Sequence, residues 1–304
     1  MIICFDIGGS AIKGAVARAP DAIEVLPRVP TPTRDFDAFV GVLRDIIAGA
    51  GAVPDCIAIS IAGVVEPDSK AIICANIPCI HGRQLAQELE AALQLPVLIA
   101  NDADCFAMAE ADIGAGRGHR IVFGVILGTG VGGGLVVDRR LVNADGGFAG
   151  EWGHGPSMAA FAGTPPVAIP AYACACGQKG CVDTVGGARG LERLHHLVHG
   201  LTLTSEEIIL QWQNGDPAAT RTVDVFADLV SSPLAVTVNI TGATIVPVGG
   251  GLSNSEPLLT EIDTRVRSRI LRPFDRPLVV RGACRVEPGL VGAAVLGFAR
   301  VAHG

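Results

Sequence analysis

Charged side chains are scarce in this 304-residue sequence, at 17% of the residues. Apolar residues make up 49% of the chain, and glycine occurs 39 times. A disordered acidic chain combines high net charge with few apolar residues, so this composition excludes that class. The apolar content and the many glycines favour an α/β globular protein with numerous tight turns. The length suggests two domains or one large one.

An excess of positive charge is also missing. Thirty acidic residues against 23 basic ones give a formal net charge of −7. A net negative field disfavours nucleic acids and anionic membranes, although small anions can still bind at backbone N–H groups. The sequence therefore predicts neither a nucleic-acid partner nor a membrane partner.

The sequence starts without a basic leader, because Met-Ile-Ile-Cys-Phe reaches Asp6 at once, and we expect no secretion signal. The nine cysteines are odd in number. Those at positions 4, 56, 74 and 105 lie in apolar surroundings, which is typical of reduced thiols that act as small hydrophobic residues. We expect a cytoplasmic protein.

Two uncharged stretches, 121–137 and 229–255, are long enough to be weighed as membrane spans. The first holds six glycines, and the second holds Pro233 and Pro247. In lipid these residues would leave backbone polar groups unsatisfied. Both stretches are therefore interpreted as buried strands and loops.

The start of the chain alternates between apolar runs and a glycine turn. The run at 2–7 ends at Gly8 and Gly9 and resumes at 12–16, which predicts a strand, a turn and a second strand. Alternating strands and helices follow, and they predict a mainly parallel sheet. The expected elements are helices at 36–47, 84–93 and 102–111, buried strands at 56–61 and 97–100, and a long helix capped by Asp216 with Pro217 at its first position.

The opening pattern returns about 120 residues later. An apolar run at 121–127 leads into a glycine turn, and a second run follows at 135–137, so two similar α/β halves are implied. The expected domains are a smaller N-terminal lobe at 1–117 and a larger C-terminal lobe at 118–304, with a hinge at 114–118 and a last helix at about 290–301 that packs back on the first lobe.

The first glycine turn has the residues of a phosphate-binding loop. Gly8 and Gly9 let backbone N–H groups approach a phosphate, and the hydroxyl of Ser10 can donate to it. Asp6 is suited to holding Mg²⁺ through water, because Mg²⁺ prefers carboxylate oxygens and retains several waters. A hairpin turn rich in glycine is the more common reading when such a loop stands alone.

Two further glycine turns favour a phosphate-binding loop over an ordinary hairpin turn. Their residues are Gly128, Thr129, Gly130, Gly132 and Gly133, and then Gly249, Gly250 and Gly251 after an apolar run at 244–248. With the first turn they resemble the two phosphate loops and the adenosine loop of the superfamily of sugar kinases, heat-shock ATPases and actin. Neither a Walker loop nor a dinucleotide fingerprint is present in the right context.

An acidic residue follows the buried strand at 97–100. Asp102, next to Asn101, stands where the strand turns into a helix. A carboxylate there can accept the proton of a substrate hydroxyl during phosphoryl transfer. The competing interpretation is structural, since Asn101 or Asp102 can also cap the helix. Both interpretations stay open from the residues alone.

Cysteines are concentrated in one short segment. Cys174, Cys176 and Cys181 lie within eight residues, and His154 lies upstream. Three thiolates and an imidazole can form a closed tetrahedral Zn²⁺ site, and this spacing favours a structural metal over a redox pair. The remaining histidine group is interpreted as a solvated helix face: His195, His196 and His199.

Five motifs together resemble the ROK family of bacterial sugar kinases and sugar-responsive repressors. They are Asp6-Ile-Gly-Gly, Asn101-Asp102-Ala, Leu127-Gly-Thr-Gly-Val-Gly-Gly-Gly134, Glu151-x-Gly-His154 and Cys174-x-Cys176-Gly-x-x-Gly-Cys181. The resemblance implies an α/β fold of the actin-like, ribonuclease H-like type, with two duplicated lobes and a zinc-binding loop. It also implies ATP and Mg²⁺ as cofactors, a structural Zn²⁺, and transfer of the γ-phosphate to the 6-hydroxyl of a hexose.

Carried over by position, the resemblance implies roles for single residues. Asp102 is the expected base and also a sugar contact. The other expected sugar contacts are Asn76, Asn101, Glu151, His154 and Asp183, and the expected zinc ligands are His154, Cys174, Cys176 and Cys181. The expected partners are ATP and a small amino sugar, with a homodimer as a possible assembly.

Four positions depart from the family pattern. Ser10-Ala11 replaces the usual Thr-Lys, and Asp183 replaces a glutamate, so its carboxylate reaches about one methylene less far. Asp104 stands where asparagine is common, and the residues alone offer no account of it.

The spacing of the expected zinc ligands points to a subgroup. The 19 residues between His154 and Cys174 are more than in many family members, and this longer form, with Asn76-Ile-Pro78, resembles bacterial N-acetylglucosamine kinases. An N-acetyl group needs room and a polar partner, which the segment 158–167 can supply. The competing functions are a glucokinase or fructokinase of the same family, or a non-catalytic sugar-sensing module. A repressor would need a DNA-binding domain and a basic cluster, and neither is seen.

Overall fold

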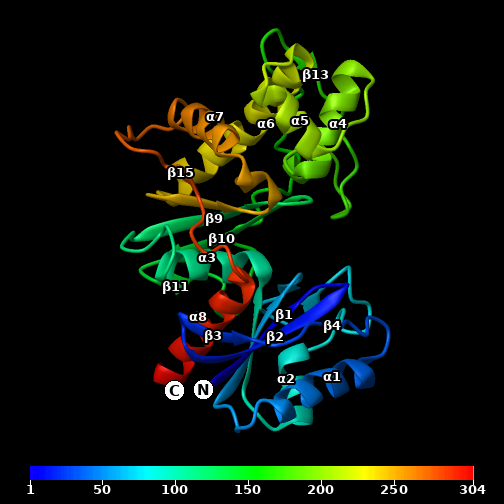
Figure 1. Ribbon diagram of the computed structural model, residues 1–304, viewed down its shortest axis with the longest axis vertical. Helices are drawn as coiled ribbons and strands as arrows, with labels where there is room; N and C mark the ends of the chain where they lie inside the picture. Colours follow the sequence, from blue (N-terminus) through cyan, green and yellow to red (C-terminus); the bar gives the residue numbers. More distant parts are fainter. Residues whose placement is uncertain (304) are drawn as a thin grey trace. The chain divides into compact units, whose positions relative to one another are not determined.

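The computed structural model describes residues 1–303. Contacts within the chain divide it into two compact units (Figure 1). Unit 1 contains Met1–Gly114, Leu135–Ala149 and the residues from Cys284 onward, and unit 2 contains Ala115–Gly134 and Gly150–Ala283. This division differs from a single boundary between residues 117 and 118, because the segment 135–149 belongs to unit 1.

A mixed sheet forms the framework of unit 1, with its strands in the order β3-β2-β1-β5-β8 and β4 paired to β2. β1 and β2 pair antiparallel around the first glycine turn, whereas β5 runs parallel to β1 and β8 parallel to β5. The predicted hairpin and parallel strands are thus confirmed. The strands of unit 1 are β1 (Ile2–Ile7), β2 (Ala11–Ala19), β3 (Ala22–Val25), β4 (Val29–Pro30), β5 (Cys56–Ile61), β6 (Val64–Val65), β7 (Ile72–Ile73), β8 (Val97–Asn101) and β11 (Arg140–Leu141).

Helices cover both faces of this sheet (Figure 1). Ile3, Phe5 and Ile7 of β1 are buried in one cluster with residues of α1 and α2. On the other face, Gly297 of α8 lies against Ile2 and Ala58, and α8 also packs on α3. A sheet buried on both faces explains why its inner strands are continuous apolar runs. The helices of unit 1 are α1 (Phe36–Gly49), α2 (Leu85–Leu93), α3 (Asp102–Asp112) and α8 (Pro288–His303).

α3 and α8 approach each other closely at Gly292. A β-carbon on this residue would overlap the backbone carbonyl group of Cys105. Glycine is therefore required for the α8 backbone to lie this close to α3. Because α3 begins at Asp102, the contact holds the helix that carries the predicted base.

The same framework recurs in unit 2. β9 and β10 flank the second glycine turn, and their sheet has the order β11-β10-β9-β14-β15. β14 runs parallel to both β9 and β15. The predicted repeat of a hairpin followed by parallel strands is confirmed. The strands of this part are β9 (Ile121–Leu127), β10 (Val131–Val137), β12 (Phe161–Ala162), β13 (Val167–Ala168), β14 (Val246–Gly249) and β15 (Val279–Arg281).

A long helix, α6, lies at the centre of unit 2 and packs against α4, α5 and α7. It begins after Asp216, whose side chain caps the N–H of Ala219, and Pro217 occupies its first turn as predicted. The helices of unit 2 are α4 (Ala188–His199), α5 (Ser205–Gln213), α6 (Pro217–Thr241) and α7 (Glu256–Arg267), with short 3₁₀ helices η1 (Val182–Thr184) and η2 (Gly251–Asn254).

α6 corrects one prediction. The sequence predicts strands and loops for the stretch 229–255, but its first part is helical, because α6 continues through Pro233 to Thr241. Among residues 1–303, α6 is the one helix long and apolar enough to cross a membrane, and more than half of its apolar window is buried in the protein. Packing on neighbouring helices offsets the helix-breaking tendency of proline at this position.

The histidine group on α4 is not a uniformly solvated face, so that interpretation is wrong for His195. His195 is fully buried, whereas His196 is exposed. Nδ1 of His195 lies 2.8 Å from Oγ1 of Thr222 on α6, and burial lowers the pKa of His195. Leu191 and Leu194 share this buried face, and their packing on α6 carries His195 into the interior.

The fit of α8 against α3 can be tested with two glycines. Gly292→Ala should destabilise the protein by about 1–3 kcal/mol, because the added methyl group must displace the backbone of α3. Gly41→Ala in α1 is the matched control, since a β-carbon there meets no atom within 4 Å. It should stabilise the helix by about 0.5–1 kcal/mol. Urea unfolding measures both changes, and equal effects in the two variants would contradict the assignment.

Candidate functional site

Asp6 lies at the carboxyl end of β1 in unit 1. Oγ of Ser60 donates a hydrogen bond of 3.0 Å to its Oδ1, and Nζ of Lys13 lies 3.9 Å from its Oδ2. Burial raises the pKa of Asp6, and the hydrogen bond from Ser60 and the charge of Lys13 oppose this rise only in part. The carboxylate is therefore held at a fixed place but is incompletely neutralised, which suits a site for a cation.

Two charged residues beside Asp6 were missed in the sequence. Nζ of Lys13 lies 2.7 Å from Oε2 of Glu287, which precedes α8. Lys13 could have been found, because it pairs directly with Asp6 in the β1–β2 register. Glu287 is 274 residues further along the chain than Lys13, so no local pattern indicates it.

The first glycine turn is a tight loop that packs on Asn76. The N–H of Gly8 donates to the carbonyl of Ala11 at 3.0 Å, and Oγ1 of Thr31 donates to the carbonyl of Gly8 at 2.7 Å. A β-carbon on Gly9 would lie 3.1 Å from Cβ of Asn76. Ser10 is exposed. The structure thus brings Gly8, Gly9 and Asn76 together.

At the junction of β8 and α3, Asn101 is the helix cap. Its Oδ1 accepts the N–H of Ala103 at 2.8 Å, and its Nδ2 donates to the carbonyl of Gly63 at 3.1 Å. Asp102 is the first helical residue, and its Oδ1 accepts the same N–H at 2.9 Å. Because Asn101 satisfies the cap, capping does not account for a carboxylate at position 102.

The structure explains the departure at Asp104. Asp104 is buried, and Nδ2 of Asn143 donates to its two oxygens at 3.3 and 3.0 Å. Nδ2 of Asn143 also donates to the carbonyl of Ala149, whose N–H donates to Oδ1 of Asn143. Asn143 therefore closes the loop 143–149 and anchors it to α3. Glu151, an expected sugar contact, follows only two residues after this loop.

In unit 2, the second glycine turn is held by Asp183. The N–H of Val131 donates to Oδ1 of Asp183 at 2.8 Å, and a β-carbon on Gly130 would overlap that oxygen. The N–H of Ala188 donates to the carbonyl of Gly128 at 2.8 Å, so the start of α4 also lies against this turn. One oxygen of Asp183 is thus engaged with the backbone of the glycine turn.

The third glycine turn lies against the second within unit 2. Gly250 has a φ of +83°, and a β-carbon on it would overlap the carbonyl of Leu127 and lie 2.7 Å from the N atom of Gly128. Gly250 therefore needs glycine both for its left-handed conformation and for its close approach. Gly251 begins η2 directly afterwards. Two of the three predicted loops are brought together at the ends of β9 and β14.

The segment that carries Glu151 packs on β10. A β-carbon on Gly133 would lie 2.7 Å from the carbonyl of Gly150, and Nε1 of Trp152 donates to the carbonyl of Gly132 at 3.0 Å. Gly132 and Gly133 therefore support this segment. Oε2 of Glu151 lies 3.7 Å from Nε2 of His154, and burial raises the pKa of Glu151.

The four predicted zinc ligands converge. The ligand atoms of His154, Cys174, Cys176 and Cys181 all lie within 4.8 Å of one another. Nδ1 of His154 is 3.6 Å from Sγ of Cys174, and Sγ of Cys176 is 3.6 Å from Sγ of Cys181. Tetrahedral zinc with Zn–S bonds of about 2.3 Å places sulfur atoms about 3.8 Å apart. The donor set and its spacing therefore fit Zn²⁺.

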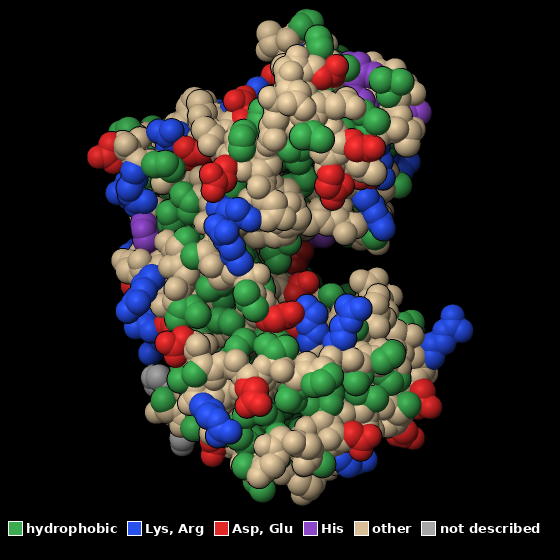
Figure 2. Space-filling view, in the orientation of Figure 1, with side chains coloured by type: hydrophobic (Ala, Val, Ile, Leu, Met, Phe, Trp, Pro, Cys, Tyr) green, Lys and Arg blue, Asp and Glu red, His purple; other side chains and the backbone are tan. Residues whose placement is uncertain are grey.

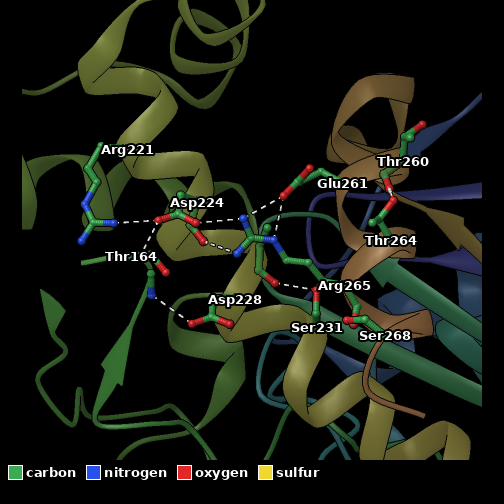
Figure 3. A network of polar contacts seen from close by, with 12 residues as sticks. Thr164, Arg221, Asp224, Asp228, Ser231, Thr260, Glu261, Thr264, Arg265 and Ser268 are labelled. Atoms are coloured by element: carbon green, nitrogen blue, oxygen red, sulfur yellow. Dashed lines mark hydrogen bonds and ion pairs between the residues drawn. The ribbon is translucent and has the colours of Figure 1, made fainter. Parts of the chain in front are cut away.

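The segment between the zinc ligands is fastened to α6 (Figure 3). It forms the hairpin of β12 and β13, whose connection contains Gly163 and Thr164. The N–H of Thr164 donates to Asp224 at 2.8 Å, and the N–H of Gly163 donates to Asp228 at 2.9 Å. Asp224 also pairs with Arg221 at 2.6 Å and with Arg265 of α7 at 2.8 Å. This network ties the hairpin to two helices of unit 2.

Asp224 gives this network a pH dependence. Burial by itself raises the pKa of Asp224, but the hydrogen bonds from Thr164 and Arg265 outweigh burial and lower it. The lowered pKa means that the unfolded chain binds this proton more readily than the folded chain. The stabilisation is therefore present above the ordinary pKa of 3.8 and is lost as the pH falls through the folded value.

For Asp224→Asn we expect a lower Tm than for the unchanged protein at pH 7. The difference should shrink as the pH is lowered below the ordinary pKa of 3.8, because a protonated aspartic acid and an asparagine at this position are both uncharged. Thermal unfolding across this pH range, followed by circular dichroism, measures the effect. A difference in Tm that stays constant with pH would show that the charge of Asp224 does not stabilise the network.

One zinc ion per chain should be present in protein purified without chelators. Cys181→Ser should lose this zinc and unfold at a lower temperature, because metal binding is coupled to the order of the loop. Cys284→Ser is the control, since Cys284 lies outside the cluster and donates to the carbonyl of Ala109. Elemental analysis and thermal unfolding measure both outcomes. Full zinc retention by Cys181→Ser would remove Cys181 from the ligand set.

This chain is similar to known proteins over nearly its whole length. The ROK family model matches residues 2–299. The N-acetyl-D-glucosamine kinase of Pectobacterium atrosepticum is 35% identical over 295 residues, covering 96% of this chain and 97% of the relative. The N-acetylgalactosamine kinase AgaK of Shewanella sp. strain ANA-3 is 34% identical over 297 residues, covering 96% and 95%.

Solved structures agree. The ROK hexokinase from Thermus thermophilus superimposes with a TM-score of 0.84 at 27% identity, covering 100% of this chain and 99% of that one. This chain thus has the actin-like α/β fold with duplicated lobes that its sequence predicts. With the family model and relatives above 30% identity in agreement, the chain belongs to the ROK family.

Proposed function

We propose that this protein transfers the γ-phosphate of ATP to the 6-hydroxyl of N-acetyl-D-glucosamine. The similarity to N-acetyl-D-glucosamine kinases over 96% of the chain carries the proposal. The site residues support it, because three glycine turns follow strands, and backbone N–H groups in such turns can bind phosphates. The 6-hydroxyl is proposed as the acceptor because the resemblance to the ROK family implies phosphorylation at that position.

Asp102 is the proposed general base. It lies at the carboxyl end of the buried parallel strand β8 and at the start of α3, while Asn101 supplies the helix cap. Phosphoryl transfer needs an acceptor for the proton of the attacking hydroxyl and precise positioning of the two substrates. The oxygen of the sugar 6-hydroxyl forms a bond to the γ-phosphorus while Asp102 accepts the proton of that hydroxyl. The bond between the γ-phosphorus and ADP breaks, and ADP leaves.

Sugar contacts are proposed in each unit separately. Asn76 and Asn101 in unit 1 carry amide groups suited to sugar hydroxyls; Nδ2 of Asn101 donates to the carbonyl of Gly63, and Asn76 lies beside Gly9. In unit 2, Nδ1 of His154 faces Cys174, so its Nε2, which lies beside Glu151, is the nitrogen left to meet a sugar. Asp183 is retained as a proposed sugar contact through the oxygen that does not accept the N–H of Val131.

The nucleotide contacts are proposed at the glycine turns. Gly8, Gly9 and Ser10 offer backbone N–H groups and a hydroxyl to the phosphates, as do Gly128, Thr129 and Gly130. Gly249, Gly250 and Gly251 lie where adenosine is expected. Mg²⁺, when bound, neutralises charge on the phosphates. Asp6, which Ser60 holds in place, would retain it through water.

Zn²⁺ fits the cluster of His154 and three cysteines as a structural ion. Four protein ligands leave no open position for a reacting water, so the ion would order the loop without entering the chemistry. Its ligand His154 would then be fixed with Nε2 toward the sugar. We also propose a cytoplasmic location, because all nine cysteines are free in the structure.

N-acetyl-D-galactosamine is the second candidate substrate. The kinase of Shewanella that is named for this sugar is 34% identical, nearly as similar as the N-acetylglucosamine kinase of Pectobacterium. Both sugars carry the N-acetyl group, and they differ only in the configuration of the 4-hydroxyl. A glucokinase, a fructokinase and a non-catalytic sensor are the competing functions that the substrate assay below separates.

A coupled ADP-release assay across a panel of hexoses tests the substrate. We expect kcat/KM for N-acetyl-D-glucosamine to exceed that for glucose and fructose by about 10-fold or more, since a group that pairs with the amide would be left unpaired. A preference for N-acetyl-D-galactosamine would move the assignment to the second candidate. A preference for glucose or fructose would overturn the amino-sugar assignment, and no ADP with any sugar would overturn the kinase.

Asp102→Asn should lower kcat by a factor on the order of 10² to 10⁴, the usual contribution of a positioned base. Sugar affinity, measured by calorimetry, should change little, because asparagine keeps the shape of the side chain. Asp112→Asn is the control, since Asp112 lies at the other end of α3 and pairs with Arg139. Turnover near that of the control would remove Asp102 from the role of base.

A further inference from the structure

His195 and His199 lie on one face of α4, four residues apart. Their ring centroids are 5.0 Å apart, with the ring planes inclined by 51°. The Nε2 atoms of both rings are buried and have no hydrogen-bond partner among the residues that the structure describes. Unpaired buried nitrogen atoms are costly in a folded protein, so this pair needs an explanation.

The hydrogen bonds of Thr222 fix which nitrogen of His195 carries the proton. The hydroxyl of Thr222 donates to the carbonyl of Ala218 at 3.1 Å. That hydroxyl oxygen can then only accept from Nδ1 of His195, which lies 2.8 Å away. The neutral ring of His195 therefore carries its proton on Nδ1, and Nε2 presents a bare lone pair beside His199.

We propose that His195 and His199 bind a divalent transition-metal ion through their Nε2 atoms. Histidines at positions i and i+4 present their rings on the same side of a helix, which is the spacing used by paired helical metal ligands. Neutral imidazole nitrogen suits Zn²⁺, Ni²⁺ and Cu²⁺, whereas Mg²⁺ and Ca²⁺ prefer oxygen. The proposed ion is therefore Zn²⁺, Ni²⁺ or Cu²⁺.

The surroundings of the pair favour a cation. The bond from His195 to Thr222 is the outer contact that metal-binding histidines generally make, since it fixes both the tautomer and the ring. His199 lies in the last turn of α4, which ends at Gly200. The carboxyl end of a helix carries partial negative charge and attracts cations. Histidine side chains reach the surface in this region (Figure 2).

This site shares no residue with the cysteine cluster at His154, so the two can be loaded separately. The experiment uses the full chain already carrying zinc, titrated with Ni²⁺ by calorimetry. Binding at imidazole gives no thiolate-to-nickel absorption band, whereas binding at cysteine does. The unchanged protein should bind one Ni²⁺ per chain without that band, and its Tm should rise.

Three variants locate the ion. His199→Gln should abolish this binding, and His196→Gln, on the exposed side of the same helix, should keep it. Thr222→Val should weaken it by about 10- to 100-fold, because the outer contact of His195 is lost. His199→Gln is chosen because His199 is only partly buried, so the fold does not depend on it.

Two results would overturn the proposal. The first is the absence of any Ni²⁺ bound outside the cysteine cluster, which would mean that water fills the space between the rings. The second is equal binding by His199→Gln and His196→Gln, which would place the ion elsewhere. Kinase activity enters neither readout, so the proposed function is tested separately.

Discussion

The carboxylate of Asp183 is the contact on which the site in unit 2 depends. Its Oδ1 accepts the N–H of Val131, and its Oδ2 lies 3.7 Å from Sγ of Cys174. One short side chain thus joins the second glycine turn to the cysteine cluster. Gly130 has no β-carbon that would displace this oxygen. A glutamate would place its carboxylate one methylene further away, so this contact gives the shorter residue a physical reason.

The framework of each unit could be predicted because its signals are local. An apolar run that ends in paired glycines indicates a strand and a turn without knowledge of the rest of the chain. Asp216 and Pro217 specify the start of α6 within two residues. The strand at Cys56–Ile61 has the predicted bounds, because a strand covered on both faces is a continuous apolar run.

The contacts that orient the site residues could not be predicted, because they join distant parts of the chain. Asn143 is 39 residues from Asp104, and Glu287 is 274 residues from Lys13. Asp224 lies 60 residues from Thr164 and 41 from Arg265. Each of these residues is an ordinary polar side chain in its own neighbourhood. His195 shows the same limit, since packing of α4 on α6 buries it.

The buried carboxylates fall into two groups, according to how far neighbouring groups compensate their charge. Asp224 is surrounded by two guanidinium groups and a backbone N–H, and its pKa is lowered, as expected for a group that stabilises the fold. At Asp6 and Glu151, burial raises the pKa and nearby partners offset it only in part. Both cost the folded state free energy at neutral pH.

An uncompensated carboxylate persists where a ligand supplies the missing partner. Asp6 lies near the end of β1, just before the first glycine turn, and Glu151 stands beside His154, so both belong to the proposed site. Asp224 and Asp228 fasten the hairpin of the zinc segment to α6. The fold thus contains a buried carboxylate whose charge is compensated by guanidinium groups, as at Asp224, and others whose charge is compensated only in part, as at Asp6 and Glu151.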